Sequence, residues 1–409
     1  MLRRPALALT LLSLVAVASA NMGGGLPSPN HPSGLTVHEW GTFTTVAGAD
    51  GYAIDWLPLG GPTDLPCFVY HYQNRRDIKL LQHDEVFDYA SARSKLWGKV
   101  RMETPVVYFY APREMSVDVE VLFPRGLMTE WYPTARLTQT VVSQMTLRNP
   151  SHVSAIRWPN VEVLPGTQAR FPVDIPKSHY YAARATEAAT LRVGDESERF
   201  LFYRGVADFD VPLAAKALDD GGVRVTNLGS DPLAGIVLFV NRGGRIGYRV
   251  HGTLTGEATV AAPSLDGSFA QLRSELERML VSAGLYPKEA AAMVETWRDS
   301  WFEEGTRVLY VVPPRAVDAI LPLRVTPAPA AVARVFVGRM DVVTPDAQRT
   351  VANAIATNDR ATLERYGRFL LPITDRILAA GVDMAMEGRT AEVNRAAFAS
   401  YRARSRICE

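Results

Sequence analysis

The sequence predicts a mixed, β-rich fold: one or two β-sandwich-like modules followed by a C-terminal α/β region with a helical hairpin. Two observations support this class. Between residues 35 and 263, short runs rich in Val, Tyr, Phe and Thr alternate with Gly, Pro, Asp and Asn, a pattern typical of strands and turns. After residue 263, apolar residues recur every three or four positions, which is the helical period. The 409 residues, 47% of them hydrophobic, are enough to bury a substantial core.

The chain begins with the features of a secretory signal peptide. Arg3 and Arg4 are followed by an apolar run over residues 7–17 and by three small residues, 18–20. We expect cleavage after Ala20; the alternative is an uncleaved anchor. With the signal removed, no transmembrane segment is expected. The protein is therefore predicted to be secreted, to the periplasm or to the outside of the cell.

Four further segments follow from changes in composition. Glycine and proline dominate the first of them, which is too polar to fold alone and is predicted to be a disordered leader. A proline-bounded stretch near residue 170 suggests a boundary between two β-rich modules. The predicted segments are the leader at 21–34, a first β-rich module at 35–170, a second at 171–263, and the helical α/β region at 264–409.

The helical hairpin is the clearest element of the last segment. Ser268 precedes apolar residues at helical spacing, and Gly284 supplies a stop. Pro287 suits the first turn of a second helix, whose apolar stripe runs to Gly305. The two helices are expected to pack against the β region.

Residues 35–46 concentrate more chemistry than any other stretch. They are strongly β-prone and contain His38, Glu39 and Trp40 directly before Gly41. In a regular strand, alternate side chains point to opposite faces, so His38 and Glu39 cannot both reach one metal or one substrate atom. A bulge at Gly41 would re-aim part of the strand. In the structural alternative, Trp40 packs, Glu39 pairs with an arginine and His38 makes a hydrogen bond.

Three segments carry a resemblance to known sequences. They are His-Glu-Trp-Gly-Thr-Phe-Thr at 38–44, Met-Glu-Thr-Pro-Val-Val-Tyr-Phe-Tyr at 102–110, and Trp-Phe-Glu-Glu-Gly-Thr-Arg at 301–307. Together they resemble a group of uncharacterised secreted bacterial proteins that share the first segment. The resemblance extends over most of the mature chain and implies a self-contained envelope protein. It brings no catalytic residues, because no activity is known for the group.

Glu39, Glu103 and Glu130 are the candidate catalytic carboxylates, together with His38 as a candidate ligand or base. Each glutamate lies among apolar or aromatic neighbours. Two carboxylates brought close together, one with a raised pKa, would suit acid and base catalysis on a glycosidic bond. Alternatively, each forms an ion pair with an arginine such as Arg101, Arg113, Arg125 or Arg204.

A divalent metal is a second hypothesis, based on the candidate ligands His38, His71 and His83. The seven histidines are scattered singly, so a metal site would have to be assembled through space. Surface histidines explain the same sequence without a metal.

Aromatic side chains suggest a binding surface instead. Trp40, Trp131 and Tyr132 are the candidate ligand-binding residues, since flat rings with apolar faces suit sugars and also anchor protein interfaces. Removing residues 1–20 takes away Arg3 and Arg4 and no acidic residue, which changes the formal net charge from +1 to about −1. This near-neutral balance argues against a nucleic-acid partner.

Cys67 and Cys408 are the two cysteines of the chain. In an oxidising compartment they are expected to pair, although two separate thiols remain the alternative. The leading functional interpretation is an exported envelope protein that binds a glycan or a protein partner. The alternative is a metal-dependent or carboxylate-pair hydrolase. Ligand identity and oligomeric state do not follow from the sequence.

Overall fold

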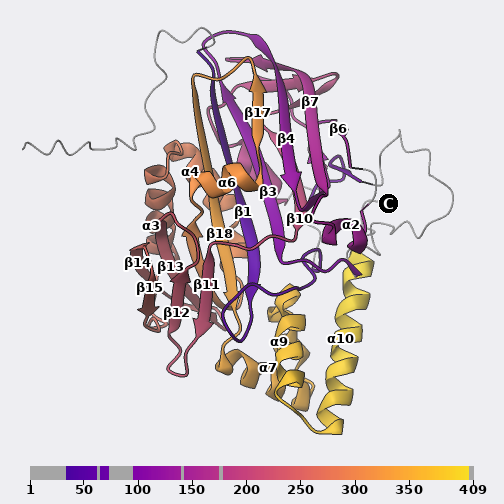
Figure 1. Ribbon diagram of the computed structural model, residues 1–409, viewed down its shortest axis with the longest axis vertical. Helices are drawn as coiled ribbons and strands as arrows, with labels where there is room; N and C mark the ends of the chain where they lie inside the picture. The colour runs from indigo at the N-terminus through magenta and orange to yellow at the C-terminus, as the bar shows by residue number, and fades with distance from the viewer. Residues whose placement is uncertain (1–33, 62–64, 73–94, 140–141, 175–177, 405–409) are drawn as a thin grey trace, which may run out of the picture.

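The computed structural model describes residues 34–61, 65–72, 95–139, 142–174 and 178–404 (Figure 1). At its centre lies a nine-stranded sheet in the order β14-β13-β16-β18-β1-β3-β10-β5-β2. Strand β1 is parallel to β18 and antiparallel to β3. In sheet order, the strands are β14 (Arg245–Leu254), β13 (Leu233–Arg242), β16 (Gly305–Val311), β18 (Ala331–Val342), β1 (Thr36–Ala47), β3 (Val100–Tyr110), β10 (Leu201–Ala207), β5 (Gly126–Tyr132) and β2 (Tyr70–His71).

Two smaller sheets accompany the central one. A six-stranded sheet has the order β17-β4-β7-β8-β9, with β6 pairing β7, and a three-stranded sheet has the order β11-β12-β15. Their strands are β17 (Leu323–Thr326), β4 (Met115–Pro124), β7 (Val153–Leu164), β8 (Thr190–Val193), β9 (Glu196–Glu198), β6 (Arg136–Leu137), β11 (Leu213–Ala217), β12 (Val223–Asn227) and β15 (Glu257–Val260).

Helices gather mainly in the C-terminal third of the chain, and α7, α9 and α10 lie together at one end of the central sheet (Figure 1). The helices are α2 (Gln144–Arg148), η1 (His179–Arg184), α3 (Phe269–Ser282), α4 (Pro287–Thr296), α5 (Arg298–Trp301), α6 (Pro314–Ile320), α7 (Pro345–Thr357), α8 (Arg360–Arg365), η2 (Gly367–Phe369), α9 (Leu370–Ala379) and α10 (Met384–Arg404). Among the described residues, no helix is both long and apolar enough to cross a bilayer.

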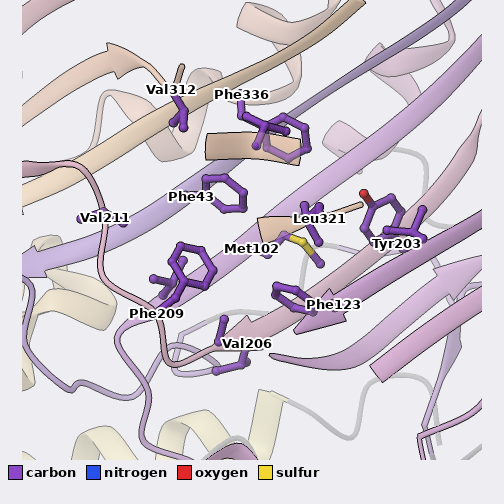
Figure 2. Packing of buried hydrophobic residues seen from close by; sticks show 14 of the residues in the cluster. Phe43, Met102, Phe123, Tyr203, Val206, Phe209, Val211, Val312, Leu321 and Phe336 are labelled. Atoms are coloured by element: carbon purple, nitrogen blue, oxygen red, sulfur yellow. The ribbon is translucent and has the colours of Figure 1, made fainter. Parts of the chain in front are cut away.

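Strand β1 divides the core into two layers by its alternation. Val37 and Phe43 belong to the apolar cluster that the central sheet shares with the six-stranded and three-stranded sheets. Phe43 stacks on Phe336 there, with ring centroids 4.9 Å apart (Figure 2). Trp40 points the other way, into the cluster built by α3 and α4. All twelve residues of β1 are buried, so both faces of this strand are covered rather than one.

The predicted helical hairpin is confirmed. Helices α3 and α4 follow one another and share an apolar cluster with the central sheet. Gly284 ends the first helix with φ +118°, a conformation that other residues rarely adopt. The predicted second helix is divided, since α4 stops at Thr296 and the short α5 continues to Trp301.

The predicted fold class, a mixed β-rich architecture with a helical C-terminal region, is confirmed. The boundaries near 170 and 263 stay a prediction. The central sheet takes strands from all three predicted modules, for example β1, β10 and β18, so its hydrogen bonding crosses both boundaries. The predicted signal peptide at 1–20 and most of the leader lie outside the described residues, as do His83 and Cys408.

Candidate functional site

The candidate site begins at an irregularity in β3. Trp40 pairs with Val106 and Thr42 with Glu103, so Thr104 and Pro105 together oppose the single residue Gly41. The bulge predicted at Gly41 is therefore present, although its extra residue belongs to the neighbouring strand. Pro105 has no N–H to donate to a ladder, which favours the interruption.

Two backbone features show how tightly this bulge is held. Thr104 has φ +44°, in the left-handed region that β-branched residues rarely occupy. A Cβ on Gly41 would lie 2.7 Å from the Phe336 ring and 3.1 Å from the Pro105 Cα, so the close approach requires glycine. At this bulge, Glu103 contacts Ser300 of α5 and Arg368 of η2, while the hydroxyl of Thr104 contacts Arg204 of β10.

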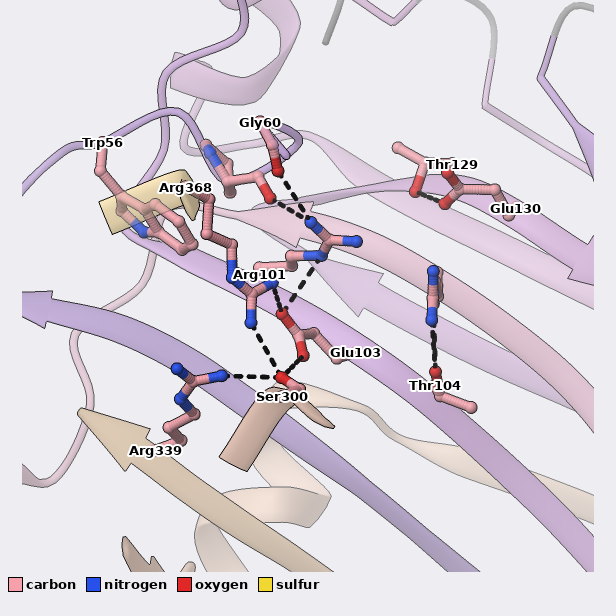
Figure 3. A network of polar contacts seen from close by, with 12 residues as sticks. Trp56, Gly60, Arg101, Glu103, Thr104, Thr129, Glu130, Ser300, Arg339 and Arg368 are labelled. Carbon is pink, nitrogen blue, oxygen red and sulfur yellow. Dashed lines mark hydrogen bonds and ion pairs between the residues drawn. The ribbon is translucent and has the colours of Figure 1, made fainter. Parts of the chain in front are cut away.

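Glu103 lies at the centre of an arginine network (Figure 3). Its carboxylate pairs with Arg368 and, at 3.3 Å, with Nε of Arg101. Ser300 donates to the second oxygen at 3.5 Å. Burial alone would raise the pKa of this carboxyl, but Arg368, helped by Arg101 and Arg339, lowers it to about 2. The Glu103 carboxyl is therefore ionised at neutral pH.

Ser300 links the network to a second layer of charge. Its hydroxyl accepts hydrogen bonds from Arg339 at 2.7 Å and from Arg368 at 3.0 Å. Arg339 also binds Glu303 at 2.8 Å and Asp341 at 3.0 Å. The guanidinium carbons of Arg339 and Arg368 lie 4.8 and 5.0 Å from the centre of the Phe369 ring, which seats η2 against the sheet.

A cavity of about 230 Å³ opens beside this network. Arg204 enters it from β10 and donates two hydrogen bonds, of 3.1 and 2.9 Å, to the hydroxyl of Thr104. His179 and Asp299 are in contact at its lining, with Nε2 of His179 2.6 Å from the Asp299 carboxylate, and Trp297 also lines it. We call this cavity, with Glu103 and the arginines around it, the Glu103 pocket.

His38, by contrast, lies in a closed contact with helix α4. Its Nδ1 is 2.7 Å from Oε2 of Glu289, a residue that is fully buried. The same carboxylate accepts a hydrogen bond from the Tyr110 hydroxyl at 2.9 Å and one from the backbone N–H of Tyr286 at 2.8 Å. The latter contact is part of a capping box that begins α4. His38 therefore holds this helix against β1.

Glu39 emerges on the opposite face of β1, as the alternation predicts. One carboxylate oxygen of Glu39 accepts a hydrogen bond from the hydroxyl of Tyr203. The other accepts one from Nε of Arg334 at 2.6 Å. Arg334 also reaches Asp318 at 2.7 Å. Burial raises the pKa of Tyr203 far above its usual value, and the charge of Glu39 adds to this effect. Glu39 thus pairs with an arginine and His38 makes a hydrogen bond, as the structural alternative predicted.

The three glutamates do not form a pair. Glu39 points away from Glu103, across the thickness of the sheet. Glu130 lies on β5 opposite Arg204, so strand β10 separates it from β3, which carries Glu103. Glu103 does pair with Arg101, one of the arginines that the sequence suggested.

The structure does not bring the predicted metal ligands together. His38 is on β1 and His71 on β2, four strand spacings away in the central sheet, which is about 19 Å. In the described part of the chain, no group of three or more His, Cys, Asp or Glu side chains is arranged to hold an ion. His83 lies outside that part.

The predicted aromatic surface needs correction. Trp40 and Trp131 are 0% and 2% exposed, because both pack in the core, and neither offers a ring face to a ligand. Tyr132 is also buried, but its edge lines an open depression of about 650 Å³ with Phe171 and Glu196. The Phe171 ring there is covered by the guanidinium groups of Arg184 and Arg199, each 5.3 Å from its centre.

Sequence reasoning missed Ser300, Arg339 and Arg368. A usable signal was an arginine inside a largely apolar strand, as at Arg307 in β16 and at Arg339 in β18, where Asp341 follows two positions later. A charge in such a position is fully buried and requires partners. Two segments of the resemblance meet here, since Thr42 pairs with Glu103. The third reaches the same network through Glu303, which binds Arg339, the strand partner of Thr44.

Cys67 is disulfide-bonded. Its predicted partner, Cys408, lies outside the described residues, so the pairing itself stays a prediction.

Comparisons with known proteins add little. No family model matches the chain, and no curated protein matches it. Among solved structures, it is similar to the yeast delta-COP-I mu-homology domain, with 9% identity over 78% of this chain and 99% of that one, at a TM-score of 0.27.

Proposed function

We propose that this protein is exported and binds a glycan in the Glu103 pocket without hydrolysing it. The observation that carries the proposal is the ionised Glu103 held between guanidinium groups at the edge of a cavity. Fixed carboxylate acceptors and guanidinium donors suit the hydroxyl groups of a sugar.

Hydrolysis is the less favoured function for two reasons. A general acid needs a pKa near the working pH, whereas the pKa of Glu103 is lowered to about 2. The other two predicted carboxylates do not join it either, because Glu39 points to the opposite face and Glu130 lies on β5, beyond β10. Asp299 and Glu303 also line the cavity, but they are held by His179 and Arg339. Reducing-end release from a mixture of oligosaccharides tests this alternative directly; turnover that disappears in Glu103→Gln would reinstate it.

Binding is tested with the mature chain, residues 21–409, on a glycan array followed by calorimetry. The His179→Ala variant removes a partly exposed side chain from the pocket lining. We expect it to weaken glycan binding about five-fold or more while the melting temperature stays within about 2 °C. Arg170→Ala, in the Tyr132 depression, is the matched control and should leave affinity unchanged.

The outcomes separate the candidate surfaces. Loss of binding in Arg170→Ala alone would indicate that the glycan binds in the depression beside Tyr132. An array without hits, combined with capture of a purified envelope protein, would favour a protein partner instead. Either result would overturn the proposal for the Glu103 pocket.

Export is tested separately. The order of basic, apolar and small residues in 1–20 predicts a mature N-terminus at Asn21. Mass spectrometry of the protein from the envelope or medium should find that terminus. A retained Met1 in the membrane fraction would indicate an anchor.

A further inference from the structure

We infer that the sugar bound in the Glu103 pocket is uncharged: its polar groups are hydroxyl or amide groups, and it is not a uronic acid, a sulfated sugar or an amino sugar. This inference rests on the proposed function for the glycan itself and adds the chemical class of that glycan. Two features of the pocket support it, the balance of charge around the cavity and the pairing of the charged groups that line it.

The charged side chains of the lining balance one another. With His179 counted as neutral, the described residues that line the cavity include three guanidinium groups and three carboxylates: Arg101, Arg204 and Arg368 against Glu103, Asp299 and Glu303. Behind the lining, Arg307 and Arg339 share Asp341, and Glu130 lies opposite Arg204 in the ladder, so the balance holds there too. A bound ion of either sign would leave a net charge in a largely buried place, which is costly.

At the buried side of the cavity, the guanidinium groups already have partners. Glu103 holds Arg101 and Arg368. Arg204 donates through Nε and Nη2 to the hydroxyl of Thr104. All three arginines are less than a tenth exposed. An acidic sugar would therefore have to displace an existing partner in order to gain a counter-charge.

At the exposed side of the cavity, the charged groups are acidic. The side chains of Asp299 and Glu303 are 61% and 32% exposed. Asp299 lies 2.6 Å from Nε2 of His179, and Glu303 binds Arg339 at 2.8 Å. A carboxylate or sulfate that enters past them meets like charge, whereas an ammonium group meets the buried arginines further in. Each kind of ion is thus opposed at one depth of the cavity.

Uncharged sugars suit such a lining. A hydroxyl group needs no counter-charge and both donates and accepts hydrogen bonds, whereas a carboxylate only accepts and an ammonium group only donates. A sugar hydroxyl can therefore contact a carboxylate or a guanidinium group without breaking the pair in which that group takes part. The cavity of about 230 Å³ has the volume of roughly seven to eight waters in the liquid, which is room for one ring rather than a long chain.

The experiment compares three forms of one ring that differ only at the exocyclic carbon: methyl D-glucoside, the methyl glycoside of D-glucuronate, and methyl 6-amino-6-deoxy-D-glucoside. At neutral pH the first is uncharged, the second carries a carboxylate and the third an ammonium group. The corresponding galactose series is measured in parallel, because charge balance does not fix the configuration of the ring. In calorimetry on the mature chain, we expect the neutral ring to bind at least about ten-fold more tightly than either ion, with an affinity that does not change as sodium chloride rises.

One variant changes the charge balance without touching the buried network. Asp299→Asn removes a negative charge from the exposed side of the lining and leaves positive charge in excess. We expect the ratio of the affinities for the neutral ring and the uronate to fall about two- to five-fold. Asp195→Asn makes the same substitution in the Tyr132 depression and should leave this ratio unchanged. Both aspartates are exposed, so the melting temperature should stay the same in both variants.

The outcomes separate this inference from the proposed function. Binding of the uronate or the amine as tightly as the neutral ring would overturn the uncharged sugar and keep the glycan site. An unchanged ratio in Asp299→Asn would show that charge balance does not set the preference, and would overturn the inference as well.

The glycan array decides the case in which no single ring binds. Hits whose terminal sugars are mostly acidic or carry free amines would overturn the inference alone, and hits with neutral terminal sugars would support it. An array without hits would overturn the proposed function and the inference together.

Discussion

Two buried polar clusters on neighbouring strands differ in one respect. At His38 and Glu39 on β1, every charged group meets a partner and the surroundings are closed: Glu289 takes three contacts, and Arg334 binds Glu39. At Glu103 on β3, the arginine network borders a cavity. This difference shows that a dense run of ionisable residues in the sequence is as typical of structural contacts as of a binding site.

The largest expected effect concerns the closed cluster. Glu39→Ala removes the buried partner of Arg334 and of Tyr203, and leaves Arg334 with the exposed Asp318. We expect the free energy of unfolding to fall by about 3–5 kcal/mol, measured by urea denaturation. Glu120→Ala is the control, because the Glu120–Arg324 pair is exposed and should contribute less than about 1 kcal/mol.

The same variant tests a functional role for Glu39. Loss of glycan binding at an unchanged melting temperature would show that Glu39 belongs to a binding site. The two clusters would then not differ in role. Equal effects of the two substitutions would show that the buried pair stabilises no more than a surface pair.

The second prediction concerns pH at the Glu103 pocket. The pKa of Glu103 falls from 4.5 in the unfolded chain to about 2 in the folded protein. The ionised carboxyl therefore adds to the free energy of unfolding above pH 4.5, and this stabilisation is lost as the pH falls through 2. We expect the free energy of unfolding of the wild type to exceed that of Glu103→Gln by about 3 kcal/mol at pH 6. This difference should decrease below pH 4.5. Urea denaturation at pH 6, 4 and 3 measures it.

The matched control for this pH series is Glu120→Gln on the exposed pair. The free energies of unfolding of wild type and Glu120→Gln should differ little at all three pH values, because a solvated carboxylate gains little from a surface arginine. A margin between wild type and Glu103→Gln that stays constant from pH 6 to 3 would contradict the lowered pKa.

The smallest effect is expected at Tyr110. Tyr110→Phe removes the hydroxyl that donates to Glu289 at 2.9 Å and leaves the contact with His38 in place. The free energy of unfolding should fall by about 1–2 kcal/mol, because one lone pair of a buried carboxylate loses its donor. Tyr52→Phe, at a tyrosine that is 54% exposed, should be neutral in the same denaturation series. A neutral Tyr110→Phe would mean that the cluster is not fully closed.

Local pattern predicted much of the fold. The hairpin of α3 and α4 follows from apolar spacing and from Gly284, and the turn between β13 and β14 follows from Gly243 and Gly244, whose φ values are +60° and +85°. These features depend on neighbours in the chain. Strand order depends on distant pairings, which explains why β1 beside β18 was not predicted.

The sequence by itself determined that His38 and Glu39 face opposite ways, because a strand alternates, and it suggested Gly41 as a place where a bulge could form. Only the tertiary structure decided their partners. Glu103, Ser300, Arg339 and Arg368 come from β3, α5, β18 and η2, and no local rule relates their positions. Their meeting depends on which helix packs over which strand, since side chains contribute to a site through the contacts that tertiary packing creates.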